Sequence, residues 1–307
     1  MTKHFLSTGS LTRDSALALF RLAADLKQGW KSGRRPTPLT GRTFALIFEK
    51  PSLRTRVTFE VGINQLGGRG VYLAGQEIGL GTRESVPDVA RNLSRWVDGI
   101  CARVYAHATI DGLAANASIP VVNGLSDFEH PCQAVADFFT LWERGIDLAK
   151  LTLAWIGDGN NVCHSVLLLG AVLGADLRVA CPPGYEPDPA VLADVRKRGG
   201  RLTVTTEPDE AARGADVIYT DVWTSMGQEA ERLTRQEAFA RYQINASLLR
   251  FAKPSSLVMH CLPAHRGEEI TDDVLDGAQS VVLDQAENRL HAQKAIILSL
   301  MEGAPDE

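Results

Sequence analysis

Several features that mark common protein classes are scarce or missing in this sequence. It contains five cysteines, an odd number, with no C-x-x-C pair and no spacing typical of zinc ligands. Free thiols in a reducing compartment are therefore the simplest account. No apolar run reaches the roughly 18–20 residues that a membrane span needs, and the first residues show no basic-then-apolar signal pattern. These absences predict a soluble, cytoplasmic protein that does not contact a membrane.

An excess of positive charge is also missing. The 32 Lys and Arg residues against 37 Asp and Glu residues give a net charge of −5, which does not favour a nucleic acid as partner. A few basic side chains that point toward one position can still form a local basic pocket in an acidic protein. Hydrophobic residues make up 45% of the chain and charged residues 22%, which is a globular rather than a disordered or fibrous composition. The 307 residues are enough for two domains.

Short apolar runs alternate with helical stretches along the chain. This alternation is typical of parallel sheets with helices on their faces, and the rhythm restarts after a long predicted helix at residues 131–144. We therefore expect an α/β fold with two doubly wound parallel-sheet domains joined by interdomain helices. The predicted strands are residues 43–48, 70–73, 99–104, 119–122, 151–156, 177–181, 217–220, 256–260 and 281–284. The other predicted helices are residues 55–66, 162–173, 189–198 and 290–301.

Hydroxyl and guanidinium side chains are gathered directly after the first predicted strand, where a helix begins. Ser52, Arg54 and Thr55 lie there, and the free N–H groups and the dipole of a helix N-terminus favour an anion. Arg54 can hold phosphate oxygens in a fork, while the two hydroxyl groups add donors. The alternative is that Ser52 or Thr55 only caps the helix and that the arginines are solvated.

Three further polar residues follow predicted strands in the first half of the chain. Arg103 comes directly after the apolar residues 99–102, a position at which a lone arginine is more often a surface charge. His130 and Gln133 lie three residues apart at the start of the helix at 131–144, so both can face one point. Their side chains suit a neutral carbonyl or amide group.

A glycine-rich segment follows the first strand of the second half. Gly157-Asp158-Gly159-Asn160-Asn161 resembles a dinucleotide-binding loop, but Val162 occupies the position of the third glycine. The next strand ends in Cys181-Pro182-Pro183, with no acidic residue for a ribose. A dinucleotide cofactor is therefore not expected.

Two later segments carry groups that can bind or react. Asp221 follows the strand at 217–220 and can pair with an ammonium group, while the loop after it can meet a carboxylate through its backbone; an ordinary polar loop is the alternative. Cys261 follows His260 and is either a nucleophile or a small buried residue. Arg289 offers one more guanidinium group near the last helix.

Taken together, these motifs resemble the aspartate/ornithine carbamoyltransferase family over residues 3–303. The resemblance is carried by Phe48-Glu49-Lys50 with Ser52-x-Arg54-Thr55-Arg56, His130-Pro131-Cys132-Gln133, Asp221 with Ser225-Met226-Gly227, and His260-Cys261-Leu262-Pro263. The last two motifs point to the ornithine branch, and Asp221 would repel the second carboxylate of aspartate.

The resemblance implies transfer of a carbamoyl group from carbamoyl phosphate to the side-chain amine of ornithine, giving citrulline and phosphate. N-acetylornithine and putrescine remain alternative acceptors. Arg103, His130 and Cys261 would act in catalysis. Carbamoyl phosphate would be bound by Ser52, Leu53 through its backbone, Arg54, Thr55, Arg103, His130, Gln133, Cys261, Leu262 and Arg289. Ornithine would be bound by Asn161, Asp221, Ser225 and Met226.

The resemblance also implies how the chain is divided and assembled. Residues 1–146 would bind carbamoyl phosphate, with the C-terminal helix at 288–307 packing back on them, and residues 147–287 would bind ornithine. The assembly would be a homotrimer, or a multiple of trimers, with active sites between subunits and no metal or cofactor. A role in arginine biosynthesis is favoured over citrulline breakdown.

Two residues depart from the family pattern. Leu53 replaces a threonine in the phosphate motif, which removes one hydroxyl donor but keeps a backbone N–H group. Gly79 replaces a glutamine that would reach the site of a neighbouring subunit, and Thr82 and Arg83 are the candidates to take over that contact. A non-catalytic protein on this scaffold would be expected to lose Arg54, His130 or Cys261, and all three are present.

Overall fold

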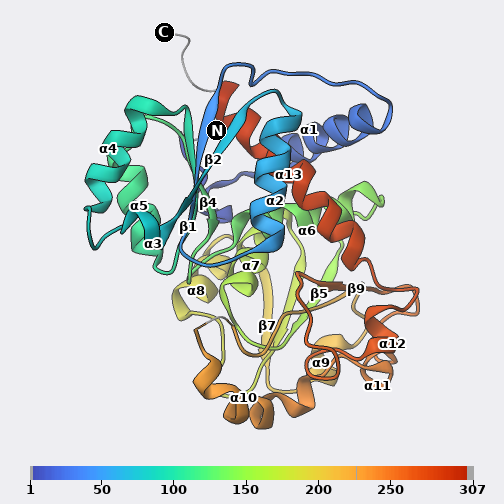
Figure 1. Cartoon of the computed structure of the whole chain (residues 1–307). Helices are drawn as coiled ribbons and strands as arrows, with labels where there is room; N and C mark the ends of the chain where they lie inside the picture. The colour runs from blue at the N-terminus through green and yellow to red at the C-terminus, as the bar shows by residue number, and fades with distance from the viewer. Residues whose placement is uncertain (1–2, 226, 303–307) are drawn as a thin grey trace. The chain divides into compact units, whose positions relative to one another are not determined.

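The computed structural model of the chain describes residues 3–225 and 227–302. The chain divides into two compact units, one formed by Met1–Phe139 with Glu287–Glu307 and the other by Thr140–Ala286. Each unit contains one parallel sheet flanked by helices (Figure 1). Helix α6 (Pro131–Glu143) leads from the first unit into the second, and α13 (Val282–Glu302) leads back. The predicted fold class is therefore confirmed.

The first unit is built on a four-stranded sheet with the order β2-β1-β3-β4, in which all neighbours are parallel. The strand order reverses between β1 and β3, and open α/β sheets bind ligands beyond the carboxyl ends of strands at such a point. The strands are β1 (Thr43–Phe48), β2 (Arg69–Ala74), β3 (Gly99–Arg103) and β4 (Val121–Leu125).

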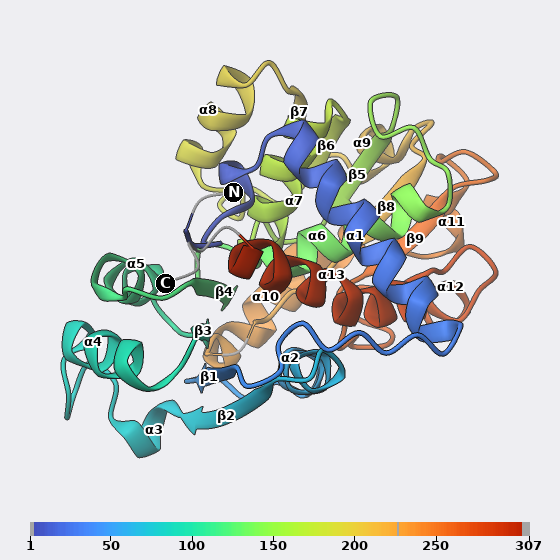
Figure 2. The ribbon, with the colours of Figure 1, turned by 90° about the horizontal axis from the view of Figure 1, so that it is seen from above.

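Helices cover both faces of this sheet, which explains why β1 is almost continuously apolar. On one face, α4 (Val86–Trp96) and α5 (His107–Asn116) lie side by side and bury residues such as Val89 and Leu113 against the strands (Figures 1 and 2). On the other face, Ile297 of α13 lies with Phe44 and Val122 around one small gap. The remaining elements are η1 (Thr8–Ser10), α1 (Arg13–Lys31), α2 (Leu53–Gln65) and α3 (Gly75–Ile78).

The second unit is built on a five-stranded parallel sheet with the order β7-β6-β5-β8-β9. Here the order reverses between β5 and β8, so a ligand is expected beyond the carboxyl ends of these two strands. The strands are β5 (Thr152–Ile156), β6 (Asp176–Ala180), β7 (Arg201–Thr205), β8 (Val217–Thr220) and β9 (Leu257–His260).

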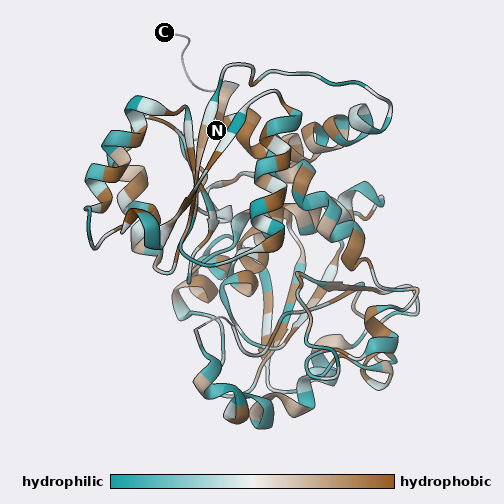
Figure 3. Cartoon of the chain, viewed as in Figure 1, coloured by the Kyte–Doolittle hydropathy of each residue, from teal (hydrophilic) through white to brown (hydrophobic). Residues whose placement is uncertain are grey.

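The core of the second unit is apolar on both sides of its sheet, as the brown strands and helix faces in Figure 3 show. Phe239 and Trp223 stack within the cluster that covers one face. The helical elements are α7 (Asn161–Leu173), α8 (Pro189–Lys197), α9 (Pro208–Ala212), η2 (Glu229–Glu231), α10 (Arg232–Phe239), η3 (Ala240–Tyr242), α11 (Ala246–Leu249) and α12 (Asp272–Leu275).

One predicted strand is wrong, and one strand of the structure was not predicted. Residues 281–284 were predicted as a strand, but α13 begins at Val282, eight residues before the predicted helix at 290–301. Val281 and Val282 are both buried and Leu283 is 77% exposed, so the burial does not alternate as it would along a strand. Strand β7 was not predicted, since its mixed sequence of Arg, Leu, Thr and Val lies at the edge of the sheet and buries few residues. Among the described residues, no helix is long and apolar enough to cross a membrane.

Candidate functional site

The predicted anion motif lies at the carboxyl end of β1, where the first sheet reverses its order. Ser52 is the N-cap of α2, and its Oγ accepts a hydrogen bond from the backbone N–H of Thr55 (3.2 Å). Helix α2 therefore begins at Leu53, two residues before the predicted start. The N–H groups at this helix start, that of Leu53 included, belong to the set that a helix cannot pair internally.

Thr55 does not cap the helix. Its side chain is fully buried, and its Oγ1 accepts hydrogen bonds from Arg289 Nη2 (2.7 Å) and Arg103 Nη1 (3.4 Å). Arg289 comes from α13, so residues more than two hundred positions apart in sequence meet at this hydroxyl group. Two guanidinium groups are thereby fixed next to the helix N-terminus, which strengthens the local attraction for an anion.

Arg103 is not a surface charge. It is the last residue of β3, paired in register with Phe48 of β1, and its side chain is buried. It lies inside the strand predicted at 99–104 and not after the apolar residues 99–102, and the alternative of a surface charge is wrong. The register explains the burial, because β1 and β3 are the central strands of the sheet and both faces are covered by helices.

His130 lies among positive charges. Burial lowers the pKa of its imidazole well below the ordinary value, and the charges of Arg289, Arg103 and Arg54 lower it further. The ring is therefore neutral at physiological pH. A neutral imidazole can donate a hydrogen bond to a carbonyl oxygen without bringing a fourth charge to the site. The first unit thus combines three guanidinium groups with one neutral donor.

Gln133 presents an acceptor rather than a donor. Its Nε2 donates to Asp137 Oδ1 (2.8 Å), and its Oε1 is buried without a hydrogen-bond partner among the residues that the structure describes. A buried acceptor left unpaired is costly unless a ligand satisfies it. The amide is therefore ready to accept from an –NH₂ group.

The second unit collects its polar groups at the carboxyl ends of β5, β8 and β9. Asp221, the residue after β8, accepts through Oδ1 from the Cys261 thiol (Sγ···Oδ1 2.9 Å) and from the backbone N–H of Val222 (2.8 Å). Its Oδ2 accepts from Asn160 Nδ2 (2.8 Å). Asp221 and Cys261 are both buried. Because the thiol donates to the carboxylate, Cys261 is protonated in this arrangement.

The asparagine that contacts Asp221 is the neighbour of the predicted one. Asn160 is the N-cap of α7, where its Oδ1 accepts from the N–H groups of Val162 and Cys163, whereas Asn161 is the first residue of the helix. The preference of asparagine for the position just before a helix is the signal that could have found it.

The glycine-rich loop after β5 serves close packing of the backbone. A Cβ atom on Gly159 would lie 2.2 Å from the backbone nitrogen of Pro187, so only glycine fits. This contact accounts for a glycine in the loop without a dinucleotide. The absence of a bound cofactor remains a prediction.

An ion pair between Asp158 and Arg235 connects the loop after β5 with the loop after β8. The sequence analysis did not predict this pair. Arg235 Nη1 donates to Asp158 Oδ2 (3.1 Å) and to the carbonyl oxygen of Trp223 (3.0 Å). Burial raises the pKa of Asp158 to about 6, although the charge and hydrogen bond of Arg235 oppose the rise. The two residues lie 77 positions apart, and no local pattern links them.

The loop that contains Ser225 folds on itself. The backbone N–H of Ser225 donates to Gln228 Oε1 (3.0 Å), and that of Gly227 donates to the carboxylate of Glu229 (3.0 Å to each oxygen). Met226, predicted to bind ornithine, lies outside the described residues. The hydrogen bond of the Ser225 N–H fixes part of this loop, whose backbone was predicted to contact a carboxylate of the ligand.

Two groups of side chains have the spacing of metal ligands within the described part of the chain. One is Asp221 with His260 and Cys261, and the other is His265 with Glu268 and Glu269. Both ring nitrogens of His260 already have protein partners, Glu269 and the backbone N–H of Leu262. A metal in the first group would displace one of these bonds, so the geometry gives no support for a metal centre there.

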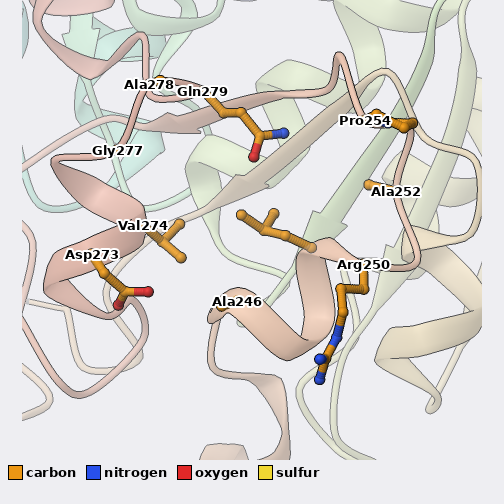
Figure 4. Close-up of a pocket in the computed structure, with 10 residues that line it drawn as sticks. Ala246, Arg250, Ala252, Pro254, Asp273, Val274, Gly277, Ala278 and Gln279 are labelled. Atoms are coloured by element: carbon orange, nitrogen blue, oxygen red, sulfur yellow. The ribbon is translucent and has the colours of Figure 1, made fainter.

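A hollow of about 540 Å³ opens beside α11 and α12 in the second unit (Figure 4). Arg250, Asp273 and Gln279 are the polar residues with long or charged side chains that line it. Arg250 donates to Ser247, and Gln279 donates to Ser256, so these polar groups are used within the fold. None of the candidate residues lines this hollow.

Family models match both parts of the chain. Residues 3–143 match the model described as aspartate/ornithine carbamoyltransferase, carbamoyl-P binding domain. Residues 149–300 match the Asp/Orn binding domain of the same family.

Individual proteins match over almost the full length. The chain is 49% identical over 299 residues to an ornithine carbamoyltransferase of Archaeoglobus fulgidus, covering 97% of each chain. It is 50% identical over 296 residues to an anabolic ornithine carbamoyltransferase of Pyrococcus furiosus, covering 95% of this chain and 93% of that one. A solved structure of ornithine carbamoyltransferase from the same organism matches with a TM-score of 0.95 at 48% identity, covering 98% of each chain.

Proposed function

The chain belongs to the aspartate/ornithine carbamoyltransferase family, and we propose that it transfers the carbamoyl group of carbamoyl phosphate to the side-chain amine of L-ornithine, giving L-citrulline and phosphate. Three arginines gathered around the neutral imidazole of His130, at the point where the first sheet reverses its order, carry this proposal. That arrangement suits a ligand with a phosphate at one end and a carbonyl group at the other.

The first unit would hold carbamoyl phosphate. Ser52, the Leu53 backbone, Arg54 and Thr55 would bind the phosphate at the N-terminus of α2, with Arg289 completing the pocket. Arg103 and His130 would donate to the carbonyl oxygen, and the unpaired Gln133 Oε1 would accept from the carbamoyl –NH₂. Cys261 and Leu262 are also proposed to contact carbamoyl phosphate, as the family resemblance implies.

The second unit would hold ornithine. Asp221 offers a carboxylate to the ammonium group of the amino-acid end, and Asn161, Ser225 and Met226 are assigned to the same end. A buried carboxylate favours a cation and repels an anion, which supports ornithine over aspartate. The names of the relatives support the same choice.

The reaction needs no covalent intermediate. The neutral amine nitrogen bonds to the carbamoyl carbon, the bond from that carbon to the phosphate oxygen breaks, and phosphate leaves with the electron pair while the amine loses a proton. Negative charge grows on the carbonyl oxygen, which Arg103, His130 and Thr55 would stabilise, and on the phosphate, which Arg54 would stabilise. One preorganised donor of this kind contributes about 3–4 kcal/mol in well-studied enzymes.

Cys261 is proposed to hold the side-chain amine in its reactive form. An alkyl ammonium group has a pKa of about 10.4, so at neutral pH only about one molecule in a thousand is ready to attack. The Cys261 thiol, hydrogen-bonded to Asp221, is a partner for that amine. Cys261→Ala should lower kcat and change the pH–rate profile, while Cys261→Ser, which keeps a donor of similar size, should lie between it and the wild type. Steady-state rates from pH 6 to 10 measure this, and an unchanged profile in Cys261→Ala contradicts it.

The assembly is proposed to be a homotrimer or a multiple of it. An apolar stripe on α2 supports association, since Leu53, Val57 and Val61 recur every four residues and are 74%, 45% and 37% exposed. Val71, on the neighbouring edge strand β2, is 46% exposed. An exposed apolar stripe of this kind marks a candidate protein–protein contact.

Charge placed in this stripe should break the assembly. Val57→Glu combined with Val61→Glu is expected to convert the oligomer to monomers, because two carboxylates would have to be buried without partners. Analytical ultracentrifugation measures the mass. Leu233→Glu, at a 77% exposed leucine of α10, is the control that should leave the mass unchanged. A trimer that survives both α2 substitutions contradicts this interface.

The contact with a neighbouring subunit would come from the segment after α3. Gly79 has a left-handed backbone (φ 61°), and a Cβ atom there would lie 2.5 Å from Arg83 Cβ, so a glutamine does not fit without a shift. Thr82 and Arg83 are therefore the proposed replacements for the family's glutamine.

The domain limits, location and metabolic direction are also proposals. The carbamoyl-phosphate domain is taken as residues 1–146 with 288–307, and the ornithine domain as residues 147–287. The two compact units have the same arrangement along the chain, with boundaries after Phe139 and after Ala286. Five free cysteines suit the cytoplasm. The relative described as anabolic supports a role in arginine biosynthesis.

Product formation tests the proposed function. Purified protein with carbamoyl phosphate should give a carbamoylated product with ornithine, and none with N-acetylornithine, putrescine or aspartate when each is assayed separately. Activity with one of the other amines would keep the phosphate site and overturn the assignment of the second unit. No activity with any of them would overturn the proposal.

A further inference from the structure

Glu269 is buried in the loop before α12 in the second unit, and the proposed reaction assigns it no contact with a substrate. Its Oε1 accepts from the backbone N–H of His265 (2.6 Å) and lies 3.0 Å from Nε2 of His260, which is also buried. Its Oε2 has no hydrogen-bond partner among the described residues. Burying a carboxylate with one oxygen unpaired is costly, and a position that served packing alone would not need it.

The hydrogen bonds of His260 fix which ring nitrogen carries the proton. The backbone N–H of Leu262 donates to His260 Nδ1 (2.9 Å). A backbone N–H can only donate, so Nδ1 must hold a lone pair, and in the neutral ring the proton then sits on Nε2. From there it is donated to Glu269 Oε1. Glu269 is thus the acceptor that stabilises the tautomer with its proton on Nε2. In this tautomer Nδ1 can accept the hydrogen bond from the Leu262 N–H.

The bond to Leu262 holds the peptide plane between Cys261 and Leu262. The peptide unit is planar and rigid, so fixing its N–H also fixes the carbonyl group of Cys261 and the direction in which the chain leaves Cys261. Leu262 has a left-handed backbone with φ 59°, which is unusual for leucine and costs about 1 kcal/mol or more. The His260 bond stabilises this conformation next to the thiol that donates to Asp221.

A second bond holds the backbone of His260 itself. Its N–H donates to Gln285 Oε1 (3.0 Å), and Gln285 Nε2 donates to the hydroxyl group of Tyr219 on β8 (2.9 Å). The end of β9 is therefore fixed at its backbone by Gln285 and at its side chain by Glu269. Only the second of these bonds depends on the tautomer of the ring.

We propose that Glu269 is a positioning residue that acts through His260 to hold the Cys261-Leu262 peptide, and with it the Cys261 thiol, in the geometry the carbamoyl transfer requires. The proposal rests on the proposed function of the site. Glu269 touches no reacting atom, and its effect passes through the hydrogen bonds from Oε1 to Nε2 and from Leu262 N–H to Nδ1.

Three variants separate this role from a purely structural one. Glu269→Leu removes the acceptor, Glu269→Gln keeps an oxygen that can accept from Nε2–H, and Glu268→Gln makes the same change at the neighbouring residue, whose carboxylate pairs with Arg232 and not with His260. Glu269→Leu should lower kcat about a hundredfold, the size of effect that a displacement of about 1 Å produces. It should change the KM for carbamoyl phosphate less than about threefold, because the proposed phosphate residues lie in the first unit. Glu269→Gln should keep kcat within about threefold of the wild type, as should Glu268→Gln.

Nitrogen NMR of histidine-labelled protein reads the tautomer without any assay. The His260 signal, assigned by its loss in His260→Asn, should show a protonated Nε2 and a bare Nδ1 in the wild type and in Glu269→Gln, and a mixture in Glu269→Leu. This readout stands even if the wild type carbamoylates none of the tested amines, so failure of the proposed function and failure of this inference are distinguishable.

Several results would overturn the inference. One is a protonated Nδ1 in the wild type. Another is an unchanged kcat in Glu269→Leu, or a large loss of kcat with the tautomer preserved. A third is that Glu269→Gln loses as much kcat as Glu269→Leu. If Glu269→Leu does not fold, Glu269→Gln decides alone, since loss of either the Nε2–H tautomer or of kcat overturns the role of the acceptor, and retention of both supports it.

Discussion

Replacing Arg103 with alanine is expected to lower kcat about 10²–10³-fold, the loss seen when one preorganised donor to a developing oxyanion is removed. The side chain is buried at the end of a central strand, and its guanidinium group donates to the hydroxyl group of Thr55. No water molecule can replace such a donor without reorganising. Steady-state kinetics with saturating carbamoyl phosphate and ornithine measure the effect.

The Arg103 variant has two informative companions. Arg103→Lys keeps the charge but loses the planar fork, so its kcat should lie between that of the wild type and that of the alanine variant. Arg95→Ala removes an exposed arginine from α4 and should leave kcat unchanged. The positive charge of Arg103 also lowers the pKa of His130, so the alanine variant should protonate that ring at a higher pH. A folded Arg103→Ala protein with normal kcat would show that Arg103 does not stabilise the transition state.

Replacing Asp221 with asparagine is expected to lower kcat/KM for ornithine about 10²–10⁴-fold. Removing one partner of a buried ion pair costs about 3–5 kcal/mol, which corresponds to that range. Asp221 also accepts from the Cys261 thiol and from Asn160 Nδ2, and a side-chain amide cannot accept at both of its ends. Both the ammonium partner and the local network are therefore lost.

The binding of carbamoyl phosphate should survive this change, because the residues proposed to hold its phosphate group lie in the first unit. Isothermal titration calorimetry of Asp221→Asn with carbamoyl phosphate should give the affinity of the wild type. Asp209→Asn, at an exposed aspartate of α9, is the matched control and should alter neither quantity. An Asp221→Asn enzyme with unchanged kcat/KM for ornithine would remove Asp221 from the ornithine site.

The strands that position the site could be predicted, because a strand that is buried on both faces has an almost uniformly apolar sequence. The sequence Thr43–Phe48 is almost uniformly apolar, as a strand covered on both faces must be, and it forms β1 with the predicted limits. The residues at 281–284 have a similar composition but begin α13. Composition alone could not separate the two cases, since a short apolar run fits a buried strand and a buried helix end equally.

Site residues that are close together in the sequence could be predicted, whereas contacts between residues far apart in the sequence could not. Ser52, Arg54 and Thr55 share one loop, so the sequence predicted them as a group. The meeting of Thr55 with Arg289 and that of Asp158 with Arg235 depend on the tertiary fold, and no spacing encodes them. Arg103 was predicted as a candidate, but its burial required the register of β3 against β1.

The central claim is that this chain carbamoylates ornithine in preference to similar amines. The most direct measurement is a competition in which carbamoyl phosphate labelled with ¹³C at its carbonyl carbon reacts with an equal mixture of ornithine, N-acetylornithine, putrescine and aspartate, followed by ¹³C NMR. The account predicts that the enzyme-dependent label appears in citrulline and that the Asp221→Asn enzyme loses this signal. Label that appears chiefly in the carbamoylated form of another amine would contradict the account.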